Sequence, residues 1–376
     1  MIQFNRTATR KPMTFRGIQA LRGFAATIVV VFHTTLAWWR IVGGMPLKQP
    51  PNFWWTGAAG VDVFFVISGF VMAVSTFGKE KQPQVARRFL ERRAIRLLPL
   101  YWIMTTVSAL ELLWLNVHPV WRTHGENYPH FTSLFFLRSL SLIPFDHEGS
   151  TDPLLAVGWT LSFEVLFYLL FALALSLRMK PVRFLVPAIF LLIFAGYFHK
   201  GTWPVFTLLA NSLLLEFLAG VLVGEAIMRG FRLRERWGLA LMGIGLFLLL
   251  LPRTELPAHR TLKWGVPAMM IVLGLSSIED RFGGRWPKWT LLLGDASYSL
   301  YLSHVLIFHL VCRAFEFQHL VVYGVVRRRD EVLLVVSCLA VALPFSLLLY
   351  QWVEKPITNL LRRRLLGEGI PQSEKH

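Results

Sequence analysis

Long apolar stretches separated by short polar or basic segments occupy most of the chain. A helix needs about 20 mainly apolar residues to cross a lipid bilayer. The segment 131–145 is shorter and interrupted, so we expect a re-entrant or interfacial piece there. The pattern predicts an all-α, polytopic integral membrane protein with about ten transmembrane helices. The stretches lie at about 18–39, 57–78, 97–117, 154–177, 183–199, 205–228, 237–252, 264–279, 289–312 and 331–353.

The lysines and arginines concentrate in every second connecting segment, which indicates the orientation. With the N-terminus in the cytoplasm, most of the 39 basic residues fall on the cytoplasmic side, as the positive-inside rule requires. We therefore expect both termini in the cytoplasm, a basic N-terminus over 1–17, a transmembrane domain over 18–357 and a basic tail over 358–376. Arg327–Arg329 fall outside in this arrangement. Either they form a functional basic patch or the count of spans near the C-terminus is wrong by one.

The composition narrows the class of protein further. Hydrophobic residues make up 55% of the chain, charged residues only 16%, and the mean hydropathy is +0.51, which excludes an ordinary soluble domain. The formal net charge of +17 does not indicate a nucleic-acid partner, because the basic residues lie between apolar stretches. Cys312 and Cys338 have neither metal-ligand spacing nor a disulfide framework, and we expect no metal site.

The first apolar stretch contains an arginine and a histidine, Arg22 and His33. A charged side chain near the centre of a spanning helix costs roughly 2.5–3.5 kcal/mol. Eleven positions separate the two residues, so both project from nearly the same face, about 16 Å apart along the axis. The pair indicates a path across the membrane. The alternative is that Arg22 reaches the inner headgroups and His33 bonds a neighbouring helix.

Other ionisable residues lie within later stretches. Glu164 is near the middle of 154–177, where an ionisable group is a functional candidate by default. Asp62 follows a glycine-rich opening near the outer boundary, where it either partners His33 or is solvated. Tyr298, together with Tyr301 and His304, is placed to form a polar stripe. Further polar residues with less informative contexts are Glu111, Glu216, Asp295 and His309.

A dense basic cluster directly precedes the third stretch. Arg93 and Arg96 are its members closest to the apolar residues. Guanidinium groups suit phosphate oxygens, so these two are candidates to hold a phosphorylated ligand at the cytoplasmic mouth. The alternative is a topology signal that contacts lipid headgroups.

Six blocks in order resemble those of one family. They are ALRGFAATIVVVFH, GVDVFFVISGF, RAIR before LLPLYW, GWTLSFEVLFY, LGDASYSLYLSH and WVEKP. Together, over roughly 16–357, they resemble the membrane-bound acyltransferase-3 family, whose members acylate O-antigens, exopolysaccharides, nodulation factors and some antibiotics. The family's Arg-x10-His signature falls on Arg22 and His33, its Arg-x-x-Arg on Arg93 and Arg96, and its acid on Glu164.

The resemblance implies an O-acyltransferase in the bacterial cytoplasmic (inner) membrane, with no bound cofactor. It implies transfer of an acyl group, with acetyl expected, from cytoplasmic acyl-CoA to a hydroxyl of a cell-surface polysaccharide or glycolipid. An acceptor that is a lipid or a secreted small molecule remains an alternative. A secondary transporter or flippase that uses the intramembrane Arg, His and Glu as a proton relay is another, although the expected internal repeat is absent from the sequence.

A mechanism follows from these residues. Arg93 and Arg96, with Arg22, are expected to hold the phosphates of acyl-CoA, and His33 to take the proton of the acceptor hydroxyl. A carboxylate, Glu164 or Asp62, is expected to orient the imidazole. An acyl-histidine intermediate is the alternative to direct transfer. Tyr298 is a candidate donor to the developing oxyanion.

Overall fold

The computed structural model describes residues 15–42, 53–124, 128–198, 204–251, 259–321, 323 and 327–367. Helices account for nearly all of the regular structure of these residues, and no β-strand is formed among them. The predicted all-α membrane fold is confirmed.

Seven helical segments among the described residues are long and apolar enough to cross a membrane, or eight if a bent pair counts as one span. They are α1 (Arg16–Ile41), η1 (Phe53–Ala59) with α2 (Gly60–Thr76), α3 (Val85–Val117), η3 (Ala156–Gly158) with α5 (Trp159–Ser176), α7 (Pro204–Leu209) with α8 (Leu214–Met228), α13 (Ser297–Phe317), and the continuous helix from α14 (Arg328–Leu349) through η6 (Tyr350–Glu354) and α15 (Lys355–Leu361) to η7 (Arg362–Leu366). The bent pair is η4 (Thr261–Gly265) with α10 (Val266–Ser277), followed by α11 (Glu279–Phe282) and η5 (Gly283–Arg285).

The predicted count of ten spans is therefore not confirmed, and three stretches explain the difference. The apolar helix α6 (Pro181–Phe198) is interrupted by Pro187, and its apolar part is short for a span. Helix α9 (Glu235–Leu249) has 15 residues. The third is the predicted stretch 264–279, which belongs to the bent pair and adds a span only if that pair counts as one. The predicted stretch 289–312 still contains a span, α13, but it breaks at Ala296, after α12 (Lys288–Asp295). The orientation of the termini stays a prediction.

Two predicted segments at the borders of the spans take definite shapes. Within 131–145 the chain forms α4 (Ser133–Ser141), a helix of 9 residues that is too short to cross a bilayer. The predicted domain boundary at residue 357 falls inside a continuous helix that ends at Leu366. Residues 1–14 and 368–376, which belong to the predicted basic termini, lie outside the described residues.

Close packing of α2 against α8 depends on two glycines. A Cβ atom at Gly69 would lie 2.0 Å from the carbonyl oxygen of Phe217, and one at Gly220 would lie 2.0 Å from that of Val66. Any side chain at these two positions would collide with the backbone of the facing helix, so the glycines allow α2 and α8 to pack closely.

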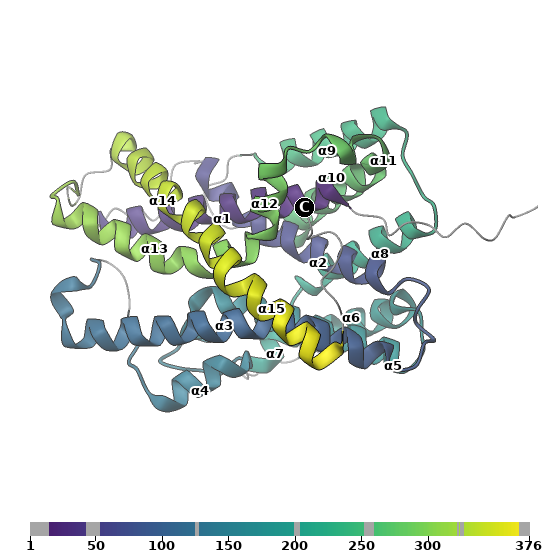
Figure 1. Ribbon diagram of the computed structural model, residues 1–376, viewed down its shortest axis with the longest axis horizontal. Helices are drawn as coiled ribbons and strands as arrows, with labels where there is room; N and C mark the ends of the chain where they lie inside the picture. Colours follow the sequence, from purple (N-terminus) through teal and green to yellow (C-terminus); the bar gives the residue numbers. More distant parts are fainter. Residues whose placement is uncertain are drawn as a thin grey trace, which may run out of the picture.

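Helix α1 occupies the middle of the molecule, in contact with α2, α12, α13 and α14. Figure 1 shows α1, α3 and α13 running across the view with their N-terminal ends toward the right. The rod of α14 and α15 passes diagonally from the region of α13 to the N-terminal half of α3, which it contacts. The N-terminal ends of α1, α3 and α13 thus gather on one side, and this is where the candidate site lies.

Candidate functional site

A cavity of about 630 Å³ lies between α1, α2, α3, α5 and α13. This volume is within the range of small-molecule sites. Phe77 and Met228, at the ends of α2 and α8, belong to its wall, so the cavity extends to the side where α1 begins. In the predicted orientation this is the cytoplasmic side. Its polar lining includes Gln19, Arg22, Ser68, Lys79, Arg93, Arg96, Thr160, Glu164, Tyr168, Tyr298 and Tyr301.

The three arginines selected from the sequence line this one cavity. Arg22 projects from α1, where its Nη1 donates to the Gln19 side chain at 3.3 Å. Arg93 and Arg96 project from α3, one turn apart. The Arg93 guanidinium lies 5.4 Å from the ring centre of Tyr168. Three guanidinium groups on one cavity form a site suited to phosphate oxygens.

Glu164 lies on the same wall as these arginines. Its carboxylate accepts a hydrogen bond from the Ser68 hydroxyl at 3.0 Å and another from the Tyr168 hydroxyl. Glu164 also acts electrostatically on Arg93. The structure therefore holds Glu164 by two hydroxyl donors in the arginine cavity, whose lining does not include His33.

His33 contacts another histidine. Its Nδ1 lies 3.1 Å from the Nε2 of His304 on α13 and 3.1 Å from the carbonyl oxygen of Val29. The two ring centres are 4.9 Å apart. His304 is buried and His33 is half-buried. The predicted orienting carboxylate is thus a wrong expectation, because an imidazole occupies its place.

The surrounding carbonyls assign the tautomers of this histidine pair. The Nδ1 of His304 lies 2.7 Å from the carbonyl oxygen of Tyr301, which only accepts, so this nitrogen carries the proton. Its Nε2 is then an acceptor. The Nδ1 of His33, between that Nε2 and the Val29 carbonyl, must carry a proton too. The Nε2 of His33 keeps its lone pair, which is the state a general base requires.

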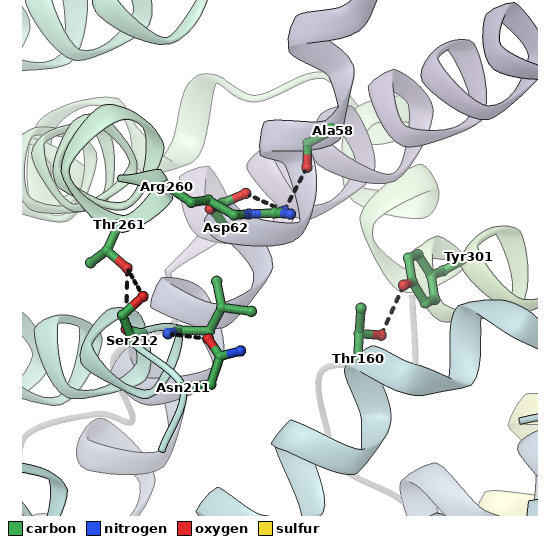
Figure 2. Close-up of polar contacts among 9 residues, drawn as sticks. Ala58, Asp62, Thr160, Asn211, Ser212, Arg260, Thr261 and Tyr301 are labelled. Atoms are coloured by element: carbon green, nitrogen blue, oxygen red, sulfur yellow. Dashed lines mark hydrogen bonds and ion pairs between the residues drawn. The ribbon is translucent and has the colours of Figure 1, made fainter. Parts of the chain in front are cut away.

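Asp62, the second predicted carboxylate, is held elsewhere. Its side chain is fully buried and accepts two hydrogen bonds from Arg260, at 2.9 and 2.7 Å. Arg260 also donates to the carbonyl oxygen of Ala58 at 3.2 Å. Figure 2 shows Arg260 with Asp62 and Ala58 as its partners. Asp62 contributes to neither the cavity nor the histidine pair. The geometry thus favours a structural ion pair over the predicted contact with His33.

Tyr301 separates the cavity from the histidine pair. Its hydroxyl pairs with that of Thr160 at 2.8 Å, as Figure 2 shows, and donates toward the carbonyl oxygen of Val157 at 3.2 Å. Its ring centre lies 5.9 Å from that of His304. The cavity lining ends at Tyr301 and Thr160 and does not include His33. The arginine cavity and the free His33 nitrogen are therefore adjacent but not joined.

Tyr298 takes a different position from the one predicted. It lines the cavity, but its hydroxyl donates to the carbonyl oxygen of Leu97 at 2.7 Å. The proton is thus engaged by the backbone, and the geometry does not favour donation to an oxyanion beside His33. Tyr298 ties α13 to α3 near the arginines.

The structure adds residues that sequence reasoning did not select. Glu354 accepts a hydrogen bond from the Ser299 hydroxyl at 2.6 Å and acts electrostatically on Arg22. Gln19 donates to Asp295. The signal for Glu354 was present, since it belongs to the WVEKP block. No sequence signal connects Arg260 to Asp62, because the two are 198 positions apart.

Comparison with known proteins decides the family. The sequence profile of the acyltransferase domain matches residues 15–351, which include the cavity and both histidines. The chain belongs to the membrane-bound acyltransferase-3 family. The exopolysaccharide production protein ExoZ of Rhizobium meliloti is 36% identical over 69% of this chain and 78% of its own.

More distant relatives carry related names. The putative membrane-bound transacylase BcsY of Komagataeibacter xylinus is 27% identical over 77% of this chain and 72% of its own. The peptidoglycan O-acetyltransferase OatA of Listeria monocytogenes is 26% identical over 44% of this chain and 25% of its own. No solved structure matches the chain. The protein is a membrane acyltransferase.

Proposed function

We propose that the protein transfers an acyl group, with acetyl the expected one, from acyl-CoA to a hydroxyl of a cell-surface polysaccharide or glycolipid. The observation that carries the proposal is the convergence of Arg22, Arg93 and Arg96 on a cavity whose inner end lies beside the His33–His304 pair. The protein resides in the bacterial inner membrane, with the cavity facing the cytoplasmic pool of acyl-CoA.

The donor's charge suits the cavity. Acyl-CoA joins an anionic nucleotide to a thioester through a slender pantetheine arm. Arg93 and Arg96 bind its phosphates from α3 and Arg22 adds a third cation from α1. Glu164 acts electrostatically on Arg22 and Arg93, and Glu354 acts on Arg22, so the two carboxylates offset part of the repulsion among these cations. The arm then points toward Tyr301.

The chemistry takes place at His33. Its Nε2 accepts the proton of the acceptor hydroxyl while the hydroxyl oxygen attacks the thioester carbon. The carbon–sulfur bond breaks, the CoA thiolate leaves, and the proton passes from His33 to that sulfur. His304 accepts from the Nδ1 of His33, which holds the ring in the required tautomer. Tyr301 and Thr160 lie between the cavity and the Nε2 of His33, so their side chains must move when the donor binds.

The acceptor class rests on the relatives. ExoZ bears the name of an exopolysaccharide production protein and OatA that of a peptidoglycan O-acetyltransferase. A hydroxyl of an exported polysaccharide is the acceptor that accounts for both names.

The test combines purified protein with whole cells. Protein in lipid nanodiscs is incubated with radiolabelled acetyl-CoA, and bound label is measured with and without excess CoA. The exopolysaccharide of cells with the protein, without it, and with His33→Ala is then compared by mass spectrometry. We expect saturable binding and ester groups that disappear in the deletion and in His33→Ala. Normal esterification by a normally inserted His33→Ala protein would remove His33 from the chemistry.

A further inference from the structure

A histidine–carboxylate pair joins α13 to α3 farther along these two helices. The Nδ1 of His309 is 3.1 Å from a carboxylate oxygen of Glu111, and both side chains are partly exposed, at 18% and 25%. Glu111 follows Arg96 by fifteen positions on α3, about 22 Å of helix rise. The pair therefore lies in the C-terminal halves of α3 and α13, away from the arginine cavity. Figure 1 draws the C-terminal ends of these two helices toward the left.

Exposed aromatic rings surround the same ends of α3 and α13. Trp114 lies 5.7 Å from Trp121, whose ring stacks on Phe317 at 5.2 Å between centres. Their exposed fractions are 46%, 41% and 60%. These three rings come from α3, the 3-10 turn η2 (Pro119–Trp121) and α13, so they form one surface across three elements.

Charged groups are built into this surface. The Arg313 guanidinium lies 6.0 Å from the Trp121 ring centre and 5.8 Å from that of Phe317, and it donates to Glu316 at 2.9 Å. The other carboxylate oxygen of Glu316 accepts from the backbone amide of His124 at 3.0 Å. The segment after α3 is thereby fixed against the end of α13.

A further contact links that segment to the Glu111–His309 pair. Arg122 donates to the Asn116 side chain at 2.5 Å and lies 5.5 Å from the ring centre of Tyr128. The Tyr128 ring in turn lies 5.9 Å from that of His309. Carboxylate and imidazole groups from α3 and α13, and guanidinium groups from α13 and the segment after α3, thus lie near the three rings.

This combination suits one class of ligand. The C–H faces of a sugar ring pack on exposed aromatic faces, while its hydroxyls both donate to carboxylates and accept from imidazole and guanidinium groups. Lipid chains would take these paired charges out of water without offering them any further hydrogen bond. A phosphorylated ligand would meet arginines that already bind Asn116 and Glu316.

We propose that Trp114, Trp121 and Phe317, with the Glu111–His309 pair, form the subsite that binds the acceptor saccharide. His309 follows His304 by five positions on α13, roughly 7.5 Å of helix rise and about 140° of rotation, so the two imidazoles share the helix while His304 faces α1 and His309 faces α3. The proposal places the saccharide toward the end of α3 opposite the arginine cavity, from which acyl-CoA approaches the His33–His304 pair. The inference rests on the proposed function for its ligand, and it assigns the residues that select it.

The competing role is a membrane anchor, because tryptophan is enriched at the interfaces of a bilayer. Trp237 on α9 provides the matched control: it is 58% exposed, carries an arginine, Arg236, over its ring at 5.4 Å, and lies outside the proposed subsite. An anchoring role predicts similar consequences for Trp121→Ala and Trp237→Ala. A saccharide role predicts a specific loss in the first variant alone.

The probe is the mixture of oligosaccharides released by mild acid from the exopolysaccharide of cells that lack the protein. Its binding to wild-type protein in nanodiscs is measured by saturation-transfer NMR, with Trp121→Ala, Glu111→Gln and Trp237→Ala compared at matched thermal stability. We expect binding by wild type and Trp237→Ala, and at least a tenfold weaker Kd for Trp121→Ala and Glu111→Gln. In turnover assays the same two variants should raise the KM for the oligosaccharide and leave the KM for acetyl-CoA unchanged.

Each outcome has a definite meaning. Absence of oligosaccharide binding by wild type, or equal binding by wild type and Trp121→Ala, would overturn the subsite. If Trp121→Ala does not fold, Glu111→Gln, which keeps the size of the side chain, gives the decision by the same measurement. Binding at the subsite without any transfer from acetyl-CoA would leave the subsite standing and would refute the proposed function.

Discussion

The Nε2 of His304 lies 3.1 Å from the Nδ1 of His33, and backbone carbonyls next to both rings assign the proton on each Nδ1. The free lone pair on the Nε2 of His33 is a consequence of this arrangement. In many hydrolytic sites a carboxylate performs the orienting role. A neutral imidazole does so here without placing a negative charge beside the base. His304 is therefore a positioning residue in the proposed reaction.

Replacement of His304 should lower kcat without changing the binding of the donor. His304→Ala removes the acceptor for the Nδ1 proton of His33 and leaves the Val29 carbonyl as its partner. Loss of one such hydrogen bond costs about 1–3 kcal/mol, or roughly 5- to 150-fold in kcat. His304→Gln restores an acceptor oxygen near the same place and should recover part of the rate. Steady-state kinetics with acetyl-CoA checks both; equal rates for Ala and Gln would argue against positioning.

Two glycines should differ sharply in their tolerance of alanine. Gly220→Ala would place a Cβ 2.0 Å from the carbonyl oxygen of Val66, so α8 must move away from α2 at a cost of about 1–3 kcal/mol or more. Gly243 on α9 has no atom within 4 Å of its Cβ position, and alanine there should be neutral or stabilising by up to about 1 kcal/mol. Thermal unfolding in one detergent compares them. Similar midpoints for the two variants would contradict the observed helix contact.

The parts of the site that share one helix could be predicted from the sequence. Arg22 and His33 lie on α1, and Arg93 and Arg96 on α3, so helical geometry and polarity within an apolar run were sufficient to select them. That Arg22, Arg93 and Arg96 meet in one cavity is a property of packing between helices. The family resemblance, confirmed over residues 15–351, made this convergence an expectation.

The partners of the selected residues could not be predicted, because they depend on how helices rotate against one another. Asp62 was expected either to partner His33 or to be solvated, but it is buried and pairs with Arg260, which is 198 positions away in the chain. His304 was placed in a polar stripe of α13, yet nothing in that stripe says that it faces α1. The break at Ala296 interrupts an apolar stretch without changing its hydropathy. For this reason the sequence predicted one span over 289–312, where the structure has two helices.

The Asp62–Arg260 pair should matter for stability more than for chemistry. Arg260→Ala leaves a fully buried carboxylate without its guanidinium, a change that typically costs about 3–5 kcal/mol. Replacing both residues, as in Asp62→Asn with Arg260→Gln, removes the unpaired charge and should recover much of the loss. Thermal unfolding in detergent measures each variant. A large loss of kcat in a double variant with restored stability would return Asp62 to the reaction.

The cavity arginines should recognise the phosphates of the donor and not its acyl group. With Arg93→Ala and Arg96→Ala combined, the KM for acetyl-CoA should rise at least tenfold, since hydrogen bonds to charged groups contribute about 1.5–3 kcal/mol each. Acetyl-pantetheine, which has the same thioester but no phosphate, should show the same low efficiency with wild type and the double variant. Arg87, whose side chain is 76% exposed and paired with Glu91, provides a basic control on the same helix, and Arg87→Ala should leave both donors unaffected. If the double variant instead impaired both donors equally, the arginines would act on the helix packing or on the thioester, and the assignment of the cavity to the CoA phosphates would have to be given up.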